Sequence, residues 1–510
     1  MSDHPEEQFT PQLPSSQPAQ EARLIDNYQL TVNNIVVDIR VEQGADEPVA
    51  IYNISIANIS ETTKVILEKI RQEFITRLDT RALEEAESTS GDNASVQEAL
   101  RKQFETEIRT LIKKYFPQIQ IDTEDMLVSY LLEENLGLGK LEILLHDSAL
   151  EEIVINNHTD PVWVYHRKHA WLKTNITILT EARIRHYAMT IGRAVGKEIT
   201  NLSPLMDAHL SSGDRVNATL LPISSKGNTI TIRKFAEDPW TITKFIKAGT
   251  ISLSAAALIW LAIQNELSIL IAGGTGSGKT SMLNVVANFF PPNQRVLSIE
   301  DTRELTLPAD LHWVPMETRL PNPEGKGEVT MLDLLVNSLR MRPDRIIVGE
   351  IRRQKEAQVL LEAIHTGHSV YATIHANDAS EVVTRLTNPP INIPKPMISS
   401  LALIVVQNRN RRTGKRRTLQ IAEVLGTGDP NVLLQYDAYN DRLVKVSDSE
   451  AVIEKIRLYT GLSLEQINRD MEEKTKVLKW LILHNVEHVD EIGAFLSKYY
   501  QGALPPDVLR

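Results

Sequence analysis

A glycine-rich octapeptide, GGTGSGKT, occupies residues 273–280 and has the composition of a phosphate-binding loop. An apolar run, Leu267–Ala272, precedes it and an apolar-periodic stretch, Met282–Phe290, follows it. We therefore expect a strand before the loop and a helix after it. Glycines let successive backbone N–H groups point into one concavity, and the helix N-terminus adds the positive end of its dipole. An ordinary Gly-rich turn is the alternative, but this context favours a site for a nucleoside triphosphate.

Two side chains of the loop could act on the nucleotide directly. Lys279 would reach the β- and γ-phosphates, and the hydroxyl of Thr280 would ligate Mg²⁺. ATP and Mg²⁺ are therefore the expected ligands. The residues predicted to bind ATP are Gly273, Gly274, Thr275, Gly276, Ser277, Gly278, Lys279, Thr280 and Ser281.

Acidic residues end two apolar segments downstream of the loop. Val296–Ile299 runs into EDTRE at residues 300–304, and Ile346–Val348 is followed by Gly349 and Glu350. A carboxylate at the C-terminal edge of a strand beside a phosphate loop stands where an attacking water would be. The acid of the second segment could also hold Mg²⁺ through water or polarise the nucleophile. A solvated acidic loop and a core strand that merely ends in an acid are the alternatives.

Two histidines, His368 and His375, bracket a further expected strand in the sequence TGHSVYATIHAND. A histidine at a strand end could hydrogen-bond a phosphate or transmit its loss to neighbouring elements. A single histidine is more often a structural residue. The pair therefore predicts a phosphate-sensing role.

The composition limits the classes of function. A chain of 510 residues suggests about three domains. Lys and Arg number 55 against 66 Asp and Glu, so the net charge of −11 argues against nucleic acid as the main partner. Cysteine is absent from the sequence, which excludes disulfides and thiolate metal sites, and no zinc is expected.

The sequence offers no membrane-targeting segment of the usual kinds. The opening residues MSDHPEEQF lack the basic and apolar regions of a signal peptide. No apolar run approaches the roughly 18 residues of a membrane-spanning helix. We expect a cytoplasmic protein that associates peripherally with a membrane through a partner.

Composition and periodicity divide the chain into segments. A Pro-, Gln-, Ser- and Glu-rich start predicts a disordered leader, and charge-laced amphipathic helices predict a mostly helical N-terminal module. Alternating helix and short apolar strand further on is typical of a parallel α/β domain. The expected segments are the leader 1–22, the N-terminal module 23–120, an α/β middle domain 121–236, a linker 237–250, and an ATPase domain 251–510 whose last part, 429–510, is a helical appendage.

Four motifs, in this order, resemble those of the secretion-ATPase superfamily, which includes type II and type IV secretion ATPases, type IV pilus motors and archaellum motors. They are GGTGSGKT as Walker A, IEDTRE as the Asp box, RMRPDRIIVGEIR as Walker B and TGHSVYATIHAND as the His box. The resemblance covers roughly residues 125–425 and includes PLMDAHLSSGDRVNAT and TITIRKF. The resemblance is closest to archaeal GspE-like ATPases, whose middle domain contains a sequence similar to VYHRKHAWLKTNI.

The resemblance implies a RecA-like P-loop core, a smaller PAS-like α/β middle domain, and roles for individual residues. Glu304, the last acid of the Asp box, matches the general base, and Glu350 matches the Walker B acid. His368 and His375 match the pair of the His box.

The resemblance also implies a role for two arginines of the middle domain. Arg215 and Arg233 match positions whose guanidinium groups approach the phosphates, from the same subunit or from the next. With Lys279 and the two acids they complete the predicted catalytic set. Ordinary surface arginines on β-strands are the alternative.

Some features depart from the family pattern. A chain without cysteine cannot carry the four-cysteine zinc insertion of bacterial relatives, and the AIRNLIRE-like signature of retraction motors is absent. Residues 1–120 have no counterpart. The basic stretch 409–417 could bind nucleic acid or anionic lipid heads, or form a solvated hairpin loop.

We expect a hexameric ring that hydrolyses ATP to ADP and phosphate and moves its middle domain as a rigid body. The motion would drive secretion or assembly of a pilin-like filament at an inner-membrane platform protein. One alternative is an ATP-driven nucleic-acid translocase, against which the acidic net charge argues. Another is a GTP-dependent switch or small-molecule kinase, but an NKxD-like guanine-reading tetrad is absent from the sequence.

Overall fold

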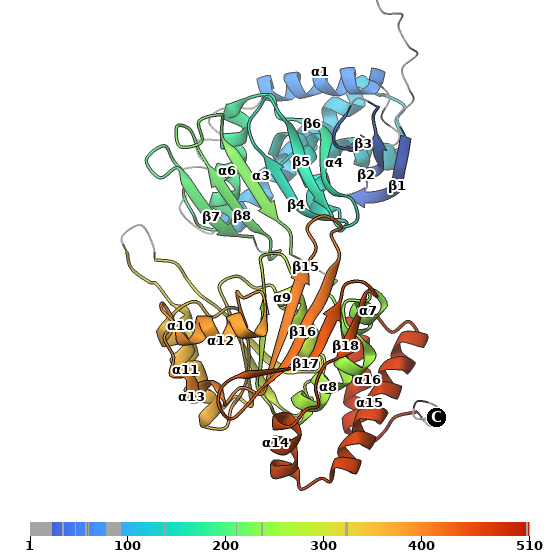
Figure 1. Ribbon diagram of the computed structural model, residues 1–510. Helices are drawn as coiled ribbons and strands as arrows, with labels where there is room; N and C mark the ends of the chain where they lie inside the picture. Colours follow the sequence, from blue (N-terminus) through green and yellow to red (C-terminus); the bar gives the residue numbers. More distant parts are fainter. Residues whose placement is uncertain are drawn as a thin grey trace, which may run out of the picture. The chain divides into compact units, whose positions relative to one another are not determined.

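The computed structural model describes residues 23–32, 35–45, 47–56, 59, 61–77, 93–136, 138–210, 212–235, 238–321, 325–505 and 508. The predicted leader, residues 1–22, lies outside this part of the chain. The chain forms two compact bodies, Met1–Phe235 and Ala236–Arg510 (Figure 1).

The first body contains a nine-stranded sheet of order β1-β2-β3-β6-β5-β4-β9-β8-β7. Its strands are β1 (Arg23–Val32), β2 (Ile35–Gln43), β3 (Ile51–Ile56), β4 (Leu150–Ile155), β5 (Pro161–His166), β6 (Ala170–Thr177), β7 (Leu205–His209), β8 (Arg215–Thr219) and β9 (Thr229–Arg233). Its helices are α1 (Glu61–Arg77), α3 (Asn93–Tyr115), α4 (Ile121–Leu136), α5 (Lys140–His146) and α6 (Glu181–Ala194).

The predicted boundary near residue 120 is not a break in this body. Strand β3 pairs in parallel with β6, through Tyr52 and Thr174 among others, so the N-terminal strands extend the sheet of the middle domain. One apolar core contains Ile70 and Ile108 of the N-terminal helices together with Ile232 of β9. Residues 23–120 are therefore not a separate, mostly helical module, because their apolar strand and helix faces are buried only within the shared core.

The second body contains a nine-stranded sheet of order β12-β11-β13-β14-β10-β15-β16-β17-β18. Its parallel part comprises β10 (Ile269–Gly273), β11 (Arg295–Glu300), β12 (His312–Glu317), β13 (Arg345–Val348), β14 (Ser369–Ile374) and β15 (Leu403–Arg409). The antiparallel continuation is β16 (Arg416–Val424), β17 (Pro430–Asp437) and β18 (Arg442–Lys445). The expected α/β P-loop core is confirmed.

Helices cover both faces of this sheet, as Figure 1 shows. Successive side chains of a strand point to opposite faces, so Ile269 and Ile271 of β10 join one core while Leu270 and Ala272 join another. The first core is covered by α7 (Ile242–Lys247), α8 (Leu253–Gln264), α9 (Lys279–Ala287), α14 (Ala451–Thr460), α15 (Leu464–Leu483) and α16 (Val489–Tyr500). The second is covered by α10 (Met331–Ser338), α11 (Gln354–His365), α12 (Ala379–Thr387) and α13 (Lys395–Ile398).

Two further predictions about segments need correction. The expected linker 237–250 contains α7, whose Ile242 and Phe245 are buried in the core of the second body. The expected helical appendage begins instead with two strands, β17 and β18, which complete the sheet. Within it, the predicted capping box of Ser463 and Gln466 is present at the start of α15. Among the described residues, no helix is long and apolar enough to cross a membrane.

Candidate active site

The glycine-rich loop joins β10, paired with β14 and β15, to helix α9 at the carboxyl edge of the parallel strands. At Gly273 a Cβ atom would lie 2.3 Å from Ser277 Oγ and 2.5 Å from the carbonyl oxygen of Gln407. Gly278 precedes α9 with φ of 97°, in the left-handed region. Only glycine suits these two positions, and the predicted strand–loop–helix arrangement is confirmed.

Lys279 is the first residue of α9, and its ammonium group is folded back over the loop. Its Nζ donates hydrogen bonds of 3.0 Å to the carbonyl oxygens of both Gly273 and Gly274. Burial lowers the pKa of Lys279, while the negative charges of Glu350 and Glu304 oppose that shift. Both predicted acids thus contribute to the electrostatic environment of this lysine.

The side chains of Glu350 and His375 are in contact beside the lysine. Glu350 follows β13, His375 follows β14, and the distance from His375 Nε2 to Glu350 Oε1 is 2.9 Å. His375 Nδ1 lies 3.5 Å from the ammonium nitrogen of Lys279. Burial and the charge of Lys279 lower the pKa of His375 against the opposite effect of Glu350. A neutral imidazole with its proton on Nε2 satisfies both contacts, donating to Glu350 and accepting from Lys279.

Arg352 connects the two acidic strand ends, although the sequence pattern alone does not predict this role. Its Nη2 lies 2.6 Å from Glu350 Oε2, and its Nη1 lies 2.6 Å from Asp301 Oδ2. Asp301 follows β11 and also accepts a hydrogen bond from the hydroxyl of Thr318 at 3.2 Å. The signal in the sequence is a cation two residues after the second acid, in VGEIR.

Glu300, at the end of β11, is buried and supports the chain that carries Glu304. One oxygen of its carboxyl group accepts hydrogen bonds from the backbone N–H groups of Glu304 at 2.9 Å and Leu305 at 3.2 Å. Burial raises the pKa of Glu300 to about 7. The first acid of EDTRE is thus a positioning residue, and the last acid remains the candidate base.

The structure separates the two histidines that were predicted to act as a pair. His368 precedes the six-residue strand β14, whereas His375 follows it. The two are seven positions apart in the sequence, so the extended strand places them roughly 23 Å apart at about 3.3 Å per residue. His368 Nδ1 lies 3.1 Å from both the carbonyl oxygen of Ala363 and the hydroxyl of Thr366. His368 therefore lies at the other end of β14 from the loop, and its predicted phosphate-sensing role stays a prediction.

The two arginines predicted to approach phosphate lie in the first body, as neighbours in the sheet. Arg215 of β8 is the cross-strand partner of Arg233 of β9. Arg215 also forms a two-point ion pair with Asp207, with distances of 3.0 and 2.6 Å. Burial would raise the pKa of Asp207, but Arg215 outweighs it and the pKa is lowered. Their role at phosphate stays a prediction, because the loop belongs to the second body.

A family model described as "Type II/IV secretion system protein" matches residues 137–428, more than half of the chain. The chain belongs to this family. The matched range contains the loop, both acidic strand ends and the segment around His375. Family membership and the geometry of the loop together identify the chain as an ATPase.

The chain is similar to several individual proteins, among them the following three. The protein MJ0900 of Methanocaldococcus jannaschii is 33% identical over 74% of this chain and 70% of its own length. The type IV secretion system protein PtlH of Bordetella pertussis is 29% identical over 56% of this chain and 93% of its own. The crystal structure of the Legionella pneumophila ATPase DotB is 20% identical, with a TM-score of 0.44, over 72% of this chain and 94% of that one.

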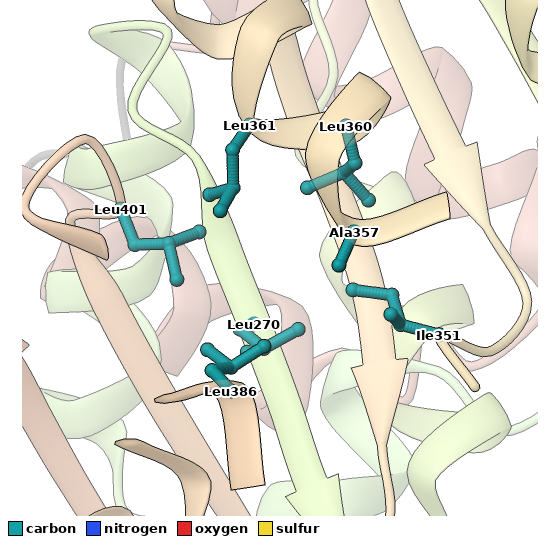
Figure 2. A pocket seen from close by; sticks show the side chains of 7 residues that line it. All are labelled: Leu270, Ile351, Ala357, Leu360, Leu361, Leu386 and Leu401. Atoms are coloured by element: carbon teal, nitrogen blue, oxygen red, sulfur yellow. The ribbon is translucent and has the colours of Figure 1, made fainter. Parts of the chain in front are cut away.

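A separate pocket of this secretion ATPase lies between β10 and helices α11 and α12 (Figure 2). Leu270 of β10 is among its lining residues, so the pocket is on the face of the sheet rather than at its carboxyl edge. Its lining is entirely aliphatic, without the N–H and cationic groups that phosphate requires. The pocket is therefore not the nucleotide site. The lining residues are Leu270, Ile351, Ala357, Leu360, Leu361, Leu386 and Leu401.

Proposed function

We propose that this protein works as a ring, most simply a hexamer, and that ATP hydrolysis moves its first body relative to its second. The motion would drive secretion or assembly of a pilin-like filament at a membrane platform protein, on the cytoplasmic side of the membrane. The observation that carries the proposal is the contact series from Lys279 through His375 to Glu350 at the loop. These residues hold a cation for phosphate and a carboxylate for water within one hydrogen-bonded unit.

The series is arranged to respond to nucleotide. The carbonyl groups of Gly273 and Gly274 hold the Lys279 ammonium over the loop, and a phosphate would compete for it with a full negative charge. When Lys279 turns to phosphate, His375 loses one of its two contacts. Glu350, which His375 and Arg352 hold from two sides, can then orient an attacking water.

Magnesium fits the oxygen donors of this site. The Thr280 hydroxyl at the start of α9 and the Glu350 carboxylate are hard oxygen ligands, which Mg²⁺ prefers, and Glu350 would act through a water molecule. When bound, the ion would neutralise charge on the phosphate oxygens. Glu304, whose backbone Glu300 fixes, is the proposed general base.

The first body supplies the proposed link between subunits. Arg215 and Arg233 are opposite each other on neighbouring strands. They would offer two permanent cations to phosphates bound by the same chain or by the next. Loss of the γ-phosphate would release them and let the body shift. Complementation between Arg215→Ala and Glu350→Gln chains in mixed rings would distinguish the two arrangements.

The first test is the sedimentation-equilibrium mass of the full chain with Mg²⁺ and a non-hydrolysable ATP analogue, and then without nucleotide. We expect a mass near six chains when the analogue is present, together with ATP hydrolysis that the Lys279→Ala variant lacks. A monomer or dimer under both conditions would contradict the ring. ATPase activity that DNA stimulates, and that salt suppresses steeply, would instead support the nucleic-acid translocase.

A further inference from the structure

The basic hairpin of the second body lies against the phosphate-binding loop. Strand β15 runs parallel to β10, with Gln407 opposite Gly273, the first glycine of the loop. Two residues later, β15 ends at Arg409, whose antiparallel partner is Arg416 at the start of β16. The strand register therefore brings both arginines to the edge of the sheet where the loop turns.

Contacts with the loop backbone place both guanidinium groups against the loop. Arg416 Nε donates a hydrogen bond of 3.1 Å to the carbonyl oxygen of Gly276. A Cβ atom added to Gly276 would lie 3.2 Å from Arg409 Nη1, and one added to Gly278 would lie 3.6 Å from Arg416 Cδ. Within the part of the chain that the structure describes, the terminal amino groups of Arg416 have no hydrogen-bond partner, so they are available to a ligand.

Neighbouring cationic residues of the hairpin contact different groups: Lys415 and Arg417 contact a carboxylate, whereas Arg416 contacts the loop. The distance from Arg417 Nε to Asp441 Oδ1 is 2.6 Å, and Lys415 forms an ion pair with the same carboxylate. Arg416 instead donates to a backbone carbonyl of the loop. Because Arg409 and Arg416 are directly opposite each other in the two strands, the hairpin places two cationic side chains next to each other at the loop.

The position of the hairpin decides which part of the nucleotide it would meet. In the sheet order, β14, β13 and β11, which carry His375, Glu350 and Glu300, all lie on one side of β10, and β15 lies on the other. Hydrolysis requires the γ-phosphate to face the carboxylates. The α- and β-phosphates then extend toward the side of β15 and the hairpin.

We propose that Arg409 and Arg416 bind the α- and β-phosphates of the nucleotide held by the loop. This inference rests on the proposed binding of ATP and adds a second cationic wall, opposite the acidic one. Because ADP and ATP share these phosphates, the arginine pair stabilises the bound nucleotide before and after hydrolysis. It contributes to affinity rather than to the rate of the chemical step.

The test uses the full chain with Mg²⁺ and either ADP or a non-hydrolysable ATP analogue, measured by titration calorimetry. We expect Arg409→Ala and Arg416→Ala each to raise the Kd for both nucleotides about tenfold or more, since hydrogen bonds to charged groups are lost. At saturating ATP, kcat should change less than about threefold. The matched control is Arg411→Ala with Arg412→Ala, which removes two exposed arginines from the tip of the same hairpin.

Several outcomes would overturn the inference. These are an unchanged Kd, an equal loss in the tip control, or a loss confined to the ATP analogue, which would place the contact at the γ-phosphate. Loss of DNA binding with unchanged nucleotide affinity would assign the hairpin to nucleic acid. If an alanine variant unfolds, Arg409→Lys and Arg416→Lys replace it in the titrations, and the melting temperature of each variant is measured to confirm that it is folded. A wild-type chain that binds neither nucleotide would instead refute the proposed function.

Discussion

The two sides of strand β10 differ in charge at the carboxyl edge of the sheet. On one side, the ends of β11 and β13 supply Glu300, Asp301 and Glu350, and Arg352 ties two of them together. On the other, β15 and β16 bring Arg409 and Arg416 against the loop. A nucleotide between them meets groups that can orient water on one flank and groups that can only hold phosphate on the other. The difference separates residues expected to control turnover from residues expected to control affinity.

The largest loss of ATP hydrolysis should come from a change at Lys279, which lies in the loop between the acidic and the basic side. Lys279→Ala removes the cation that reaches the β- and γ-phosphates, and we expect ATP hydrolysis to fall at least about a thousandfold, with binding also weakened. Steady-state phosphate release measures this. Activity within about tenfold of wild type would show that the loop does not hold the hydrolysed nucleotide.

The next effect belongs to the acidic flank alone. Glu350→Gln keeps the size of the side chain but removes its charge, so we expect nucleotide binding to persist while kcat falls at least about a hundredfold. Glu304→Gln should lower kcat similarly. The matched control is Glu362→Gln, an exposed residue of α11. A Glu304 variant that loses nucleotide binding would contradict its role as the general base.

A smaller effect should follow when the acid is kept but its support is removed. Arg352→Ala frees Glu350 and Asp301 from the cation that holds them, and we expect kcat to fall about tenfold with little change in the Kd for ADP. The exposed Lys355 lies near Arg352 in the sequence, and Lys355→Ala is the control for a lost positive charge. If both variants lowered kcat equally, the effect of Arg352 would come from its positive charge alone and not from its contacts with Glu350 and Asp301.

The last effect is on stability and its dependence on pH, and no change in turnover is expected from it. Burial raises the pKa of Glu300 from 4.5 to about 7, so the folded state binds its proton more tightly than the unfolded state does. Stability from this group is therefore present below pH 4.5 and is lost as pH rises toward 7, by up to about 3 kcal/mol. Glu300→Gln cannot ionise, so its melting temperature relative to wild type should rise by several degrees between pH 5 and pH 8. A constant difference across that range would contradict the raised pKa.

Much of the site could be predicted because its parts are contiguous. The loop from Gly273 to Thr280 depends on local backbone freedom and on the helix that follows, and both can be read in one stretch of sequence. Strand β11 ends at Glu300, and Glu350 comes two residues after the end of β13, so each acid follows a short apolar run. The structure places these acids where their positions at strand ends indicated.

Other parts could not be predicted, since they depend on which strands become neighbours. His368 and His375 belong to one motif, but a strand places its two ends at opposite edges of a sheet. Arg416 lies 140 positions from Gly276 in the sequence and contacts it only because β15 is next to β10. The same reasoning applies to the N-terminal strands, whose pattern indicates strands but not that β3 would pair with β6.

The sequence by itself determined the α/β class of the second body, the phosphate-binding loop, the acids at the strand ends and the family. Each of these depends on periodicity or on residues close together in the chain. The tertiary structure alone decided that residues 23–120 share one sheet and core with the middle domain. It also decided that His375, Lys279 and Glu350 meet, and that two arginines of a basic hairpin face the loop. The reason is physical: local pattern dictates which elements form, whereas burial of their apolar faces selects the strand order that brings distant side chains together.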